Sequence, residues 1–197
     1  MIFQQLFSTI GFSNAYLVGP RGGGDALLVD PGEFDATMLQ AIEGNRLRLR
    51  WILVTHAHRA HVAGLTGLRR VSDPEIYCNQ PSVLEDPARH VQDGDRLVLG
   101  EISVEVIELP GHSIDSLCFL VGHMLFSGDS LSAGSVGRTR DGLALGLLLS
   151  GIRRRLLPLG DDILLFPGHG PPSRIGIERR FNPYLSGEPS RDPAAAT

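Results

Sequence analysis

The sequence predicts an α+β protein in which β-sheets pack together and helices cover their outer faces. Three observations support this fold class. Short apolar runs bounded by turn residues alternate with a few segments of helical period, and this succession recurs in two halves of similar make-up. The length of 197 residues, 42% of them hydrophobic, suits one substantial core. We therefore expect a single domain over residues 1–185, although the pattern does not fix the order of its strands.

The first half opens with a predicted hairpin and a helix. Two apolar runs, Tyr16–Val18 and Ala26–Val29, flank a connection rich in Gly and Pro, which is typical of a hairpin. The apolar residues of segment 34–42 then follow a helical period. Asp35 is the expected N-cap of this helix and Gly44 its stop.

A buried strand and a second helix are expected next. The run 51–54 has the length of a buried strand, and the apolar stripe of residues 62–71 predicts a helix directly after it. Further strands are expected at EIYC, RLVLG, ISVEVIELP, SLCFLVG, HMLFSGD and ILLFPGHG, the last leading into a short helical segment before NPYL. A helix is also expected over residues 141–160, with an apolar face of Leu143, Leu147, Leu148, Ile152 and Leu156. The polar, proline-rich tail 186–197 is expected to be mobile.

Composition and charge exclude several kinds of partner. The net charge of −4 gives no broad basic field, so a nucleic-acid partner is not expected. No apolar run approaches the ~20 residues that span a bilayer, and the N-terminus lacks a basic leader, so we expect a soluble, cytoplasmic protein without a membrane partner. Cys78 and Cys118 are far apart and are expected to be reduced and buried. The pattern does not indicate an oligomeric state.

Five of the seven histidines and one aspartate occupy the same kind of position, directly after a predicted strand. Strand ends at one edge of a sheet are where side chains distant in sequence converge. Imidazole and carboxylate together suit zinc, iron or manganese, and the lack of thiolates disfavours a closed structural zinc site. His90 and His123 look like surface or turn residues and are not expected to bind metal. The six candidate ligands are His56, His58, His61, His112, Asp129 and His169.

The motifs THAHRAH, PGHS, SGDSLSAGSVGRT, FPGHG and NPYL, in this order, resemble the metallo-β-lactamase superfamily, and within it the single-domain glyoxalase II-like (hydroxyacylglutathione hydrolase-like) branch. SNAYLV and LLVDPG, upstream, resemble the same branch, so the resemblance extends over nearly the whole chain to Leu185. It implies an αββα sandwich, the metallo-β-lactamase fold, with metals at one edge. This matches the layered sheets and helices expected from the pattern.

The resemblance also implies two metal positions and reveals one departure. The first position would consist of His56, His58 and His112, with Asp129 bridging to a second position of His61 and His169. The family pattern adds an aspartate immediately before His61, and here that residue is Ala60. The second position is therefore expected to be weaker and to be filled partly or not at all, whereas the first is complete.

A second departure lies in GRTRD, and Arg138, Asp115 and Asp30 have two possible roles each. Arg140 stands where the branch often has an aspartate after GRT, and Asp141 follows it. Arg138 is a candidate for binding an anionic group of the substrate, with a structural ion pair as the alternative. Asp115 is either a substitute carboxylate near the metals or a turn residue, and Asp30 either orients a ligand or forms a turn.

Three functions agree with these residues. The first is a glyoxalase II-like metallo-hydrolase, in which hydroxide bound to one or two zinc ions at Asp129 attacks a thioester or a similar activated carbonyl. The second is a mononuclear iron dioxygenase acting on a persulfide, because persulfide dioxygenases resemble this chain in the same motifs and hold iron through residues matching His56, His112 and Asp129. The third is a degenerate, non-catalytic metal-binding protein. The expected partner is a small thioester or thiol-derived molecule.

Overall fold

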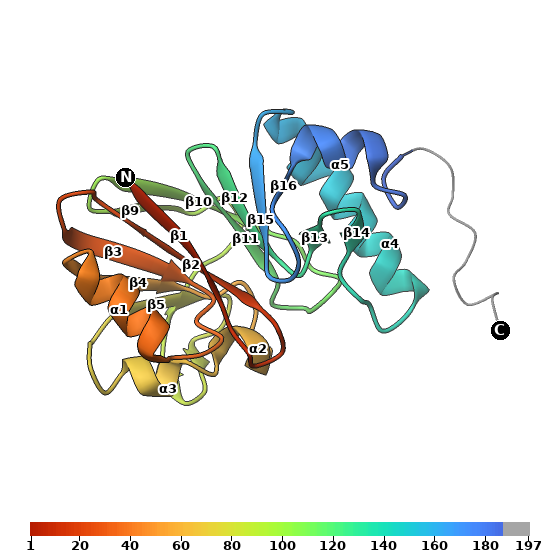
Figure 1. Cartoon of the computed structure of the whole chain (residues 1–197). Helices are drawn as coiled ribbons and strands as arrows, with labels where there is room; N and C mark the ends of the chain where they lie inside the picture. Colours follow the sequence, from red (N-terminus) through yellow and green to blue (C-terminus); the bar gives the residue numbers. More distant parts are fainter. Residues whose placement is uncertain (187–197) are drawn as a thin grey trace.

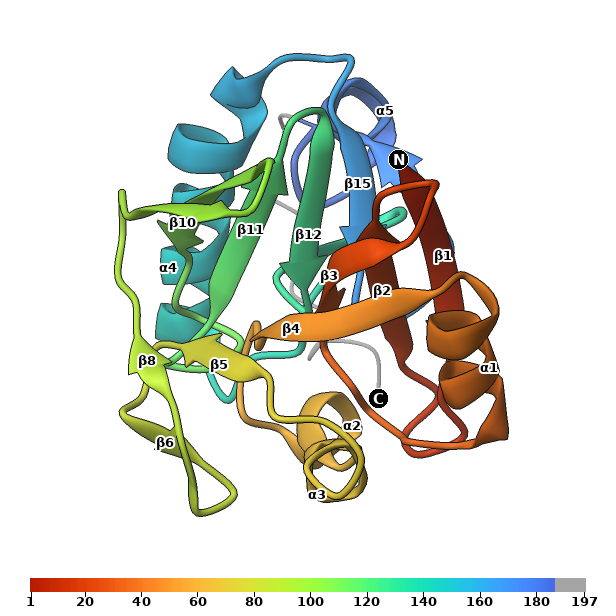
Figure 2. The ribbon, with the colours of Figure 1, turned by 90° about the vertical axis from the view of Figure 1, so that its left-hand side faces the viewer.

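A computed structural model describes residues 1–186 and shows two six-stranded sheets packed face to face, with helices on both outer sides (Figure 1). This is the αββα arrangement, and the predicted fold class is confirmed. Figure 2 shows the two sheets one behind the other, with α1 and α3 toward the viewer and α4 and α5 behind the second sheet. Apart from Ser186, the predicted tail 186–197 lies outside the described residues.

The two sheets come from successive halves of the chain. The first has the order β1 (Ile2–Phe7), β2 (Asn14–Gly19), β3 (Gly24–Val29), β4 (Leu47–Leu53), β5 (Glu75–Cys78), β8 (Arg89–His90). The second has the order β16 (Ser173–Arg174), β15 (Leu164–Pro167), β12 (Met124–Gly128), β11 (Leu117–Val121), β10 (Ile102–Glu108), β9 (Arg96–Leu99). Two small hairpins pair β6 (Ser82–Val83) with β7 (Asp86–Pro87) and β13 (Leu131–Ser132) with β14 (Ser135–Val136).

The helices occur between the strands along the chain and lie on the outer faces of the two sheets. They are α1 (Ala36–Gly44), α2 (Arg59–Val62), α3 (Leu65–Leu68), α4 (Gly142–Gly151), a π-helical turn η1 (Ile152–Leu156), a 3₁₀ turn η2 (Leu157–Leu159) and α5 (Ile175–Phe181). Asp35 caps α1 as predicted, because its side chain accepts a hydrogen bond from the backbone N–H of Met38 at 2.8 Å. Among the described residues, no helix is long and apolar enough to cross a membrane.

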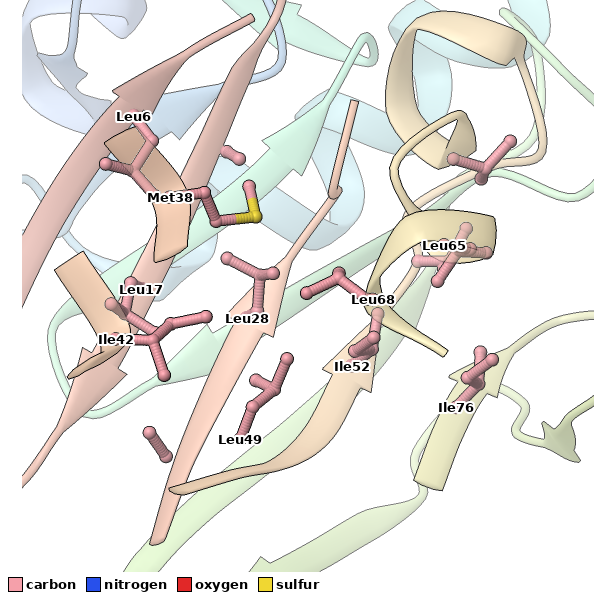
Figure 3. Packing of buried hydrophobic residues seen from close by; sticks show 14 of the residues in the cluster. Leu6, Leu17, Leu28, Met38, Ile42, Leu49, Ile52, Leu65, Leu68 and Ile76 are labelled. Carbon is pink, nitrogen blue, oxygen red and sulfur yellow. The ribbon is translucent and has the colours of Figure 1, made fainter. Parts of the chain in front are cut away.

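Three apolar layers hold the sandwich together, and the alternation of side chains along the strands decides which residues enter each. In β3, Leu28 faces the helices α1 and α3 while Leu27 faces the second sheet. Figure 3 shows the first outer layer, where Leu28 and Ile52 lie beneath the helices. The central layer joins both sheets, and the third layer lies between the second sheet and α4, η1 and α5.

Two expectations about helices are wrong. The single helix predicted over 62–71 is two short helices, because the backbone N–H of Gly64 donates to the carbonyl of Pro31 (2.8 Å) and leaves the helical pattern. In α4, the predicted apolar face is only partly buried. Leu148 is fully buried, whereas Leu143 and Leu147 remain 83% and 46% exposed. The sheet beneath α4 covers only a narrow stripe of the helix surface.

Candidate metal centre

The loops that follow β4, β10, β12 and β15 meet at one edge of the sandwich, and they bring all six predicted ligands together. The carboxylate of Asp129 lies at the middle of the cluster. Its Oδ1 is 3.4 Å from His61 Nε2. Its Oδ2 is 3.5 Å from Nε2 of both His112 and His169, and 3.9 Å from His56 Nε2. The sixth residue, His58, has its Nδ1 at 3.1 Å from His112 Nε2.

The cluster has a buried base and an open side. The side chains of His56 and His61 are almost completely buried, those of His112, His169 and Asp129 are half-buried, and that of His58 is exposed. A catalytic metal site keeps one position accessible to water or substrate, in contrast to a closed structural site. The arrangement therefore suits catalysis more than structural support.

The ring orientations show that the donors suit a metal ion. In four rings Nδ1 is already committed as a proton donor: His56 to Thr55 Oγ1, His61 to Asp30, His112 to the carbonyl of Arg138 and His169 to the carbonyl of Phe12, at 2.8–3.1 Å. For His112 and His169 the partner is a carbonyl, which can only accept a hydrogen bond, so the proton lies on Nδ1 and Nε2 is left as a lone-pair donor. All four Nε2 atoms point at Asp129.

The distances between the nitrogen and oxygen donor atoms also suit a bound metal ion. Within the described residues, His56 Nε2, His61 Nε2 and Asp129 Oδ1 are buried without a hydrogen-bond partner, which is costly unless something else satisfies them. The 3.4–3.9 Å from nitrogen to carboxylate exceeds an ordinary N–H···O distance. It approaches the roughly 3.3 Å between two ligands of a tetrahedral zinc with bonds of about 2.0 Å. The residues present therefore fit a metal ion.

Two subsets of the cluster, which share His56, have their ligand atoms within 4.8 Å of one another. The first is His56, His58 and His112, and the second is His56, His61 and Asp129. His169 adjoins the second subset, since its ring centroid is 5.2 Å from that of His61. The first subset contains the three histidines that the resemblance assigns to the first position, whereas the second shares His56 with it and lacks His169, so it overlaps the implied second position only in His61 and Asp129.

Asp30 orients the buried half of the cluster. It sits in left-handed backbone conformation with φ of 50° directly after β3, and its carboxylate accepts from the backbone N–H of Thr55 (2.7 Å), from Thr55 Oγ1 (2.6 Å) and from His61 Nδ1 (3.1 Å). Since Thr55 Oγ1 donates to Asp30, it accepts from His56 Nδ1. Both predicted readings of Asp30, turn residue and orienting residue, describe this one position.

Electrostatics differ between the two buried imidazoles. Burial and the charge of His61 lower the pKa of His56 to about 2, so this ring is neutral and needs to lose no proton to act as a ligand. Burial also acts to lower the pKa of His61, but the carboxylates of Asp30 and Asp129 outweigh it and raise that pKa to about 10. Burial opposes ionisation of Asp129, yet contacts with His61 and His56 hold its pKa well below the usual range. His61 must therefore lose a proton before it can bind metal.

Residues that the sequence did not indicate hold the loop of His169. Asn14 Nδ2 donates to the carbonyls of Pro167 (3.0 Å) and Gly170 (2.8 Å), and the Tyr16 hydroxyl donates to Pro167 (2.6 Å). Both side chains are buried in β2 of the opposite sheet. The sequence signal that could have indicated these two residues was a polar residue and a hydroxyl at the start of an otherwise apolar strand.

Ala60 is enclosed by the loop between β1 and β2. Its carbonyl accepts from Ser13 Oγ at 2.5 Å, and Gly11 lies so close that a Cβ added there would meet the Cβ of Ala60 at 2.7 Å. Gly11 also has a φ of +72°, which favours glycine. The loop between β1 and β2 therefore lies directly against Ala60, the residue before His61.

Three other expected residues have clear structural places. The Arg138 side chain is exposed, and its carbonyl orients His112, as described above. Asp115 accepts from the backbone N–H of Ala57 (3.0 Å) and from Ser113 Oγ, so both carboxylate oxygens serve the loops that carry His58 and His112. Asp141 caps α4 by accepting from the N–H of Ala144 at 2.8 Å.

Gly168→Ala is expected to weaken metal binding by roughly 10- to 100-fold, the range seen when residues that support a metal ligand are changed. A Cβ at this position would lie 2.5 Å from both Asp129 Oδ1 and His61 Cε1, so it would displace the donors. Competition with a chromophoric chelator measures the affinity. Gly146→Ala, in α4 with open space around its Cβ, is the matched control and should not change affinity. Equal affinities for both variants would argue against Asp129 and His61 as ligands.

Two sheets between layers of helices, with imidazoles and a shared carboxylate at one sheet edge, define a class of metal-dependent proteins rather than one activity. Within that class the family is shown directly by the sequence. The model of the Metallo-beta-lactamase superfamily matches residues 8–169, and the chain belongs to this superfamily.

Several relatives and solved structures are similar over most of their length. The chain is 32% identical over 186 residues to hydroxyacylglutathione hydrolase GloC of Haemophilus influenzae, which covers 82% of this chain and 88% of that protein. The structure of ETHE1 from Myxococcus xanthus is 29% identical with a TM-score of 0.85, covering 96% of this chain and 86% of that one. TTHA1623, solved in a di-iron-bound form, is 31% identical with a TM-score of 0.78, covering 94% and 100%.

Proposed function

We propose that the protein is a metal-dependent hydrolase that cleaves a thioester or a similarly activated carbonyl. The observation that carries this proposal is the set of Nε2 atoms directed at one carboxylate, on a site with an open side. The similarity to GloC, named a hydroxyacylglutathione hydrolase, supports the choice of a thioester. The proposed first metal position is His56, His58, His112 and Asp129, and the proposed second is His61, His169 and Asp129.

A bound zinc or iron supplies Lewis acidity and an activated water at neutral pH. The chain supplies the remaining requirements. Asp129 stays ionised because of its imidazole neighbours, and so it remains a ligand over the pH range in which enzymes work. Thr55 and the carbonyl of Arg138 hold the Nδ1 protons of His56 and His112, which keeps both Nε2 atoms directed inward. The exposed side next to His58 admits the substrate carbonyl.

A mononuclear iron dioxygenase is the second candidate, favoured by one specific observation. Two imidazoles and one carboxylate, the facial arrangement of non-haem iron oxygenases, occur here as His56, His112 and Asp129, with 3.9 and 3.5 Å from the rings to Asp129. The overall fold is also similar to that of ETHE1, with a TM-score of 0.85 and 29% identity. The weaker second position, where Ala60 replaces an aspartate, is compatible with either candidate.

The metal content of protein purified without added metal, followed by assays on the same sample, distinguishes the candidates. Zinc at one to two ions per chain, with release of thiol from a thioester, is the expected result. One iron per chain with oxygen uptake on a persulfide would establish the dioxygenase instead. Tightly bound metal with neither activity would contradict both and leave a binding protein.

A further inference from the structure

A groove with apolar walls opens beside His112. It encloses about 320 Å³ and runs from the loop after β10 to the first two turns of α4. Ile114 and Leu143 on its walls are 85% and 83% exposed, and Leu147 is 46% exposed. Exposed apolar side chains that gather along a groove make it a candidate binding surface, whereas single exposed ones need no explanation.

The exposed leucines are not needed by the core. Another face of α4 and η1 buries Leu148, Ile152 and Leu156 against the second sheet. Leu143 and Leu147 face away from that layer and leave apolar surface in water, which costs about 25 cal/mol per Å². A ligand that covers them would recover this free energy.

Two charged side chains that line the groove pair with each other. Arg140 and Asp141 line it, but Arg140 Nε donates to Asp141 Oδ2 at 3.0 Å, and Asp141 Oδ1 accepts from the N-terminus of α4. The pair carries no net charge. Among the described residues that line the groove, only His112 and this pair bear ionisable side chains, and the Nε of the single cation, Arg140, is already bonded to Asp141.

The groove is continuous with the candidate metal centre, because His112 both lines its end and directs its Nε2 at Asp129. We infer that the groove binds an apolar chain of the substrate, attached on either the acyl or the thiol side of the thioester, and that the preferred substrates are apolar thioesters rather than thioesters of a charged peptide thiol. This inference rests on the proposed hydrolase function.

Two series of thioesters test it. In one, the acyl chain is lengthened from acetyl to octanoyl on a fixed small thiol, and in the other the alkyl chain of the thiol is lengthened on a fixed acetyl group. We expect kcat/KM to rise between about two- and fourfold per methylene in one series, up to the equivalent of about 0.8 kcal/mol per buried methylene. The series that responds identifies which side enters the groove. No rise in either series would overturn the inference while leaving the hydrolase intact.

Variants locate the effect. Ile114→Ser and Leu143→Ser should each flatten the dependence on chain length. Val98→Ser on β9 and Ile177→Ser on α5 remove exposed apolar side chains outside the groove and should preserve the dependence on chain length. An equal loss in all four variants would mean that general surface hydrophobicity, not this groove, causes the dependence.

A binding measurement separates failure of the groove from failure of the proposed function. If neither series is hydrolysed, the hydrolase is wrong, and titration of the protein with n-hexanol, followed through the methyl NMR signals of Ile114, Leu143 and Leu147, still tests the groove. Shifts confined to these methyl groups, absent with ethanol at the same concentration, support an apolar site. Unchanged signals overturn it.

Discussion

Asp129→Asn is expected to remove most of the bound metal and to lower thioester turnover by at least about a hundredfold, the upper end of the effect of mutating residues that merely support metal ligands. The carboxylate lies 3.4–3.9 Å from four imidazole nitrogens, so both proposed metal positions share it. The amide has nearly the same shape, but it lacks the negative charge and presents an N–H₂ group toward ligand nitrogens. Metal analysis and turnover on the same sample measure both losses.

The control for this variant is Asp162→Asn, which neutralises an exposed carboxylate before β15. It should retain both metal and activity. Circular dichroism of the two variants checks that each remains folded. Full metal content in folded Asp129→Asn protein would refute the assignment of the centre.

Ala60→Asp is expected to raise metal content from near one ion per chain toward two. The added carboxylate would complete the proposed second position, to which only His61, His169 and the shared Asp129 are assigned. Its negative charge would also offset the cost of placing a second cation beside the first. Isothermal titration of metal-free protein, with stoichiometry as the readout, is the measurement.

Ala57→Asp provides the matched change, because it adds the same charge to the same loop on an exposed side chain. It should leave the stoichiometry unchanged. If Ala60→Asp is folded and still binds one ion, the account of the second position is wrong.

The convergence of the candidate ligands was predictable from sequence because their positions follow a rule that local pattern reveals. His112, Asp129 and His169 each follow an apolar run that ends in a turn, and sheet edges gather such residues. The residues that orient them were mostly not predictable. The carbonyl of Phe12 accepts from His169 Nδ1 although the two are 157 positions apart, and a backbone carbonyl carries no sequence signal.

The helix α4 shows a related limit. Its sequence is apolar on nearly every side, so the period predicts a broad buried face that includes Leu143. Which part of that face meets the sheet depends on how far the strands reach, and this is decided by tertiary packing. The leucines that were wrongly predicted to be buried line the groove. Apolar side chains that follow the sequence pattern of a core but remain exposed to solvent are available to bind a ligand.

The division of the ligands between the two sheets has a consequence for folding. His56, His58 and His61 follow a strand of the first sheet, whereas His112, Asp129 and His169 follow strands of the second. Neither half of the chain holds a full coordination set while it is being synthesised or while it is separate. We therefore expect capture of the proposed metal to follow docking of the two halves, and the ion would then act as a cross-link that favours the native state over partly assembled chains.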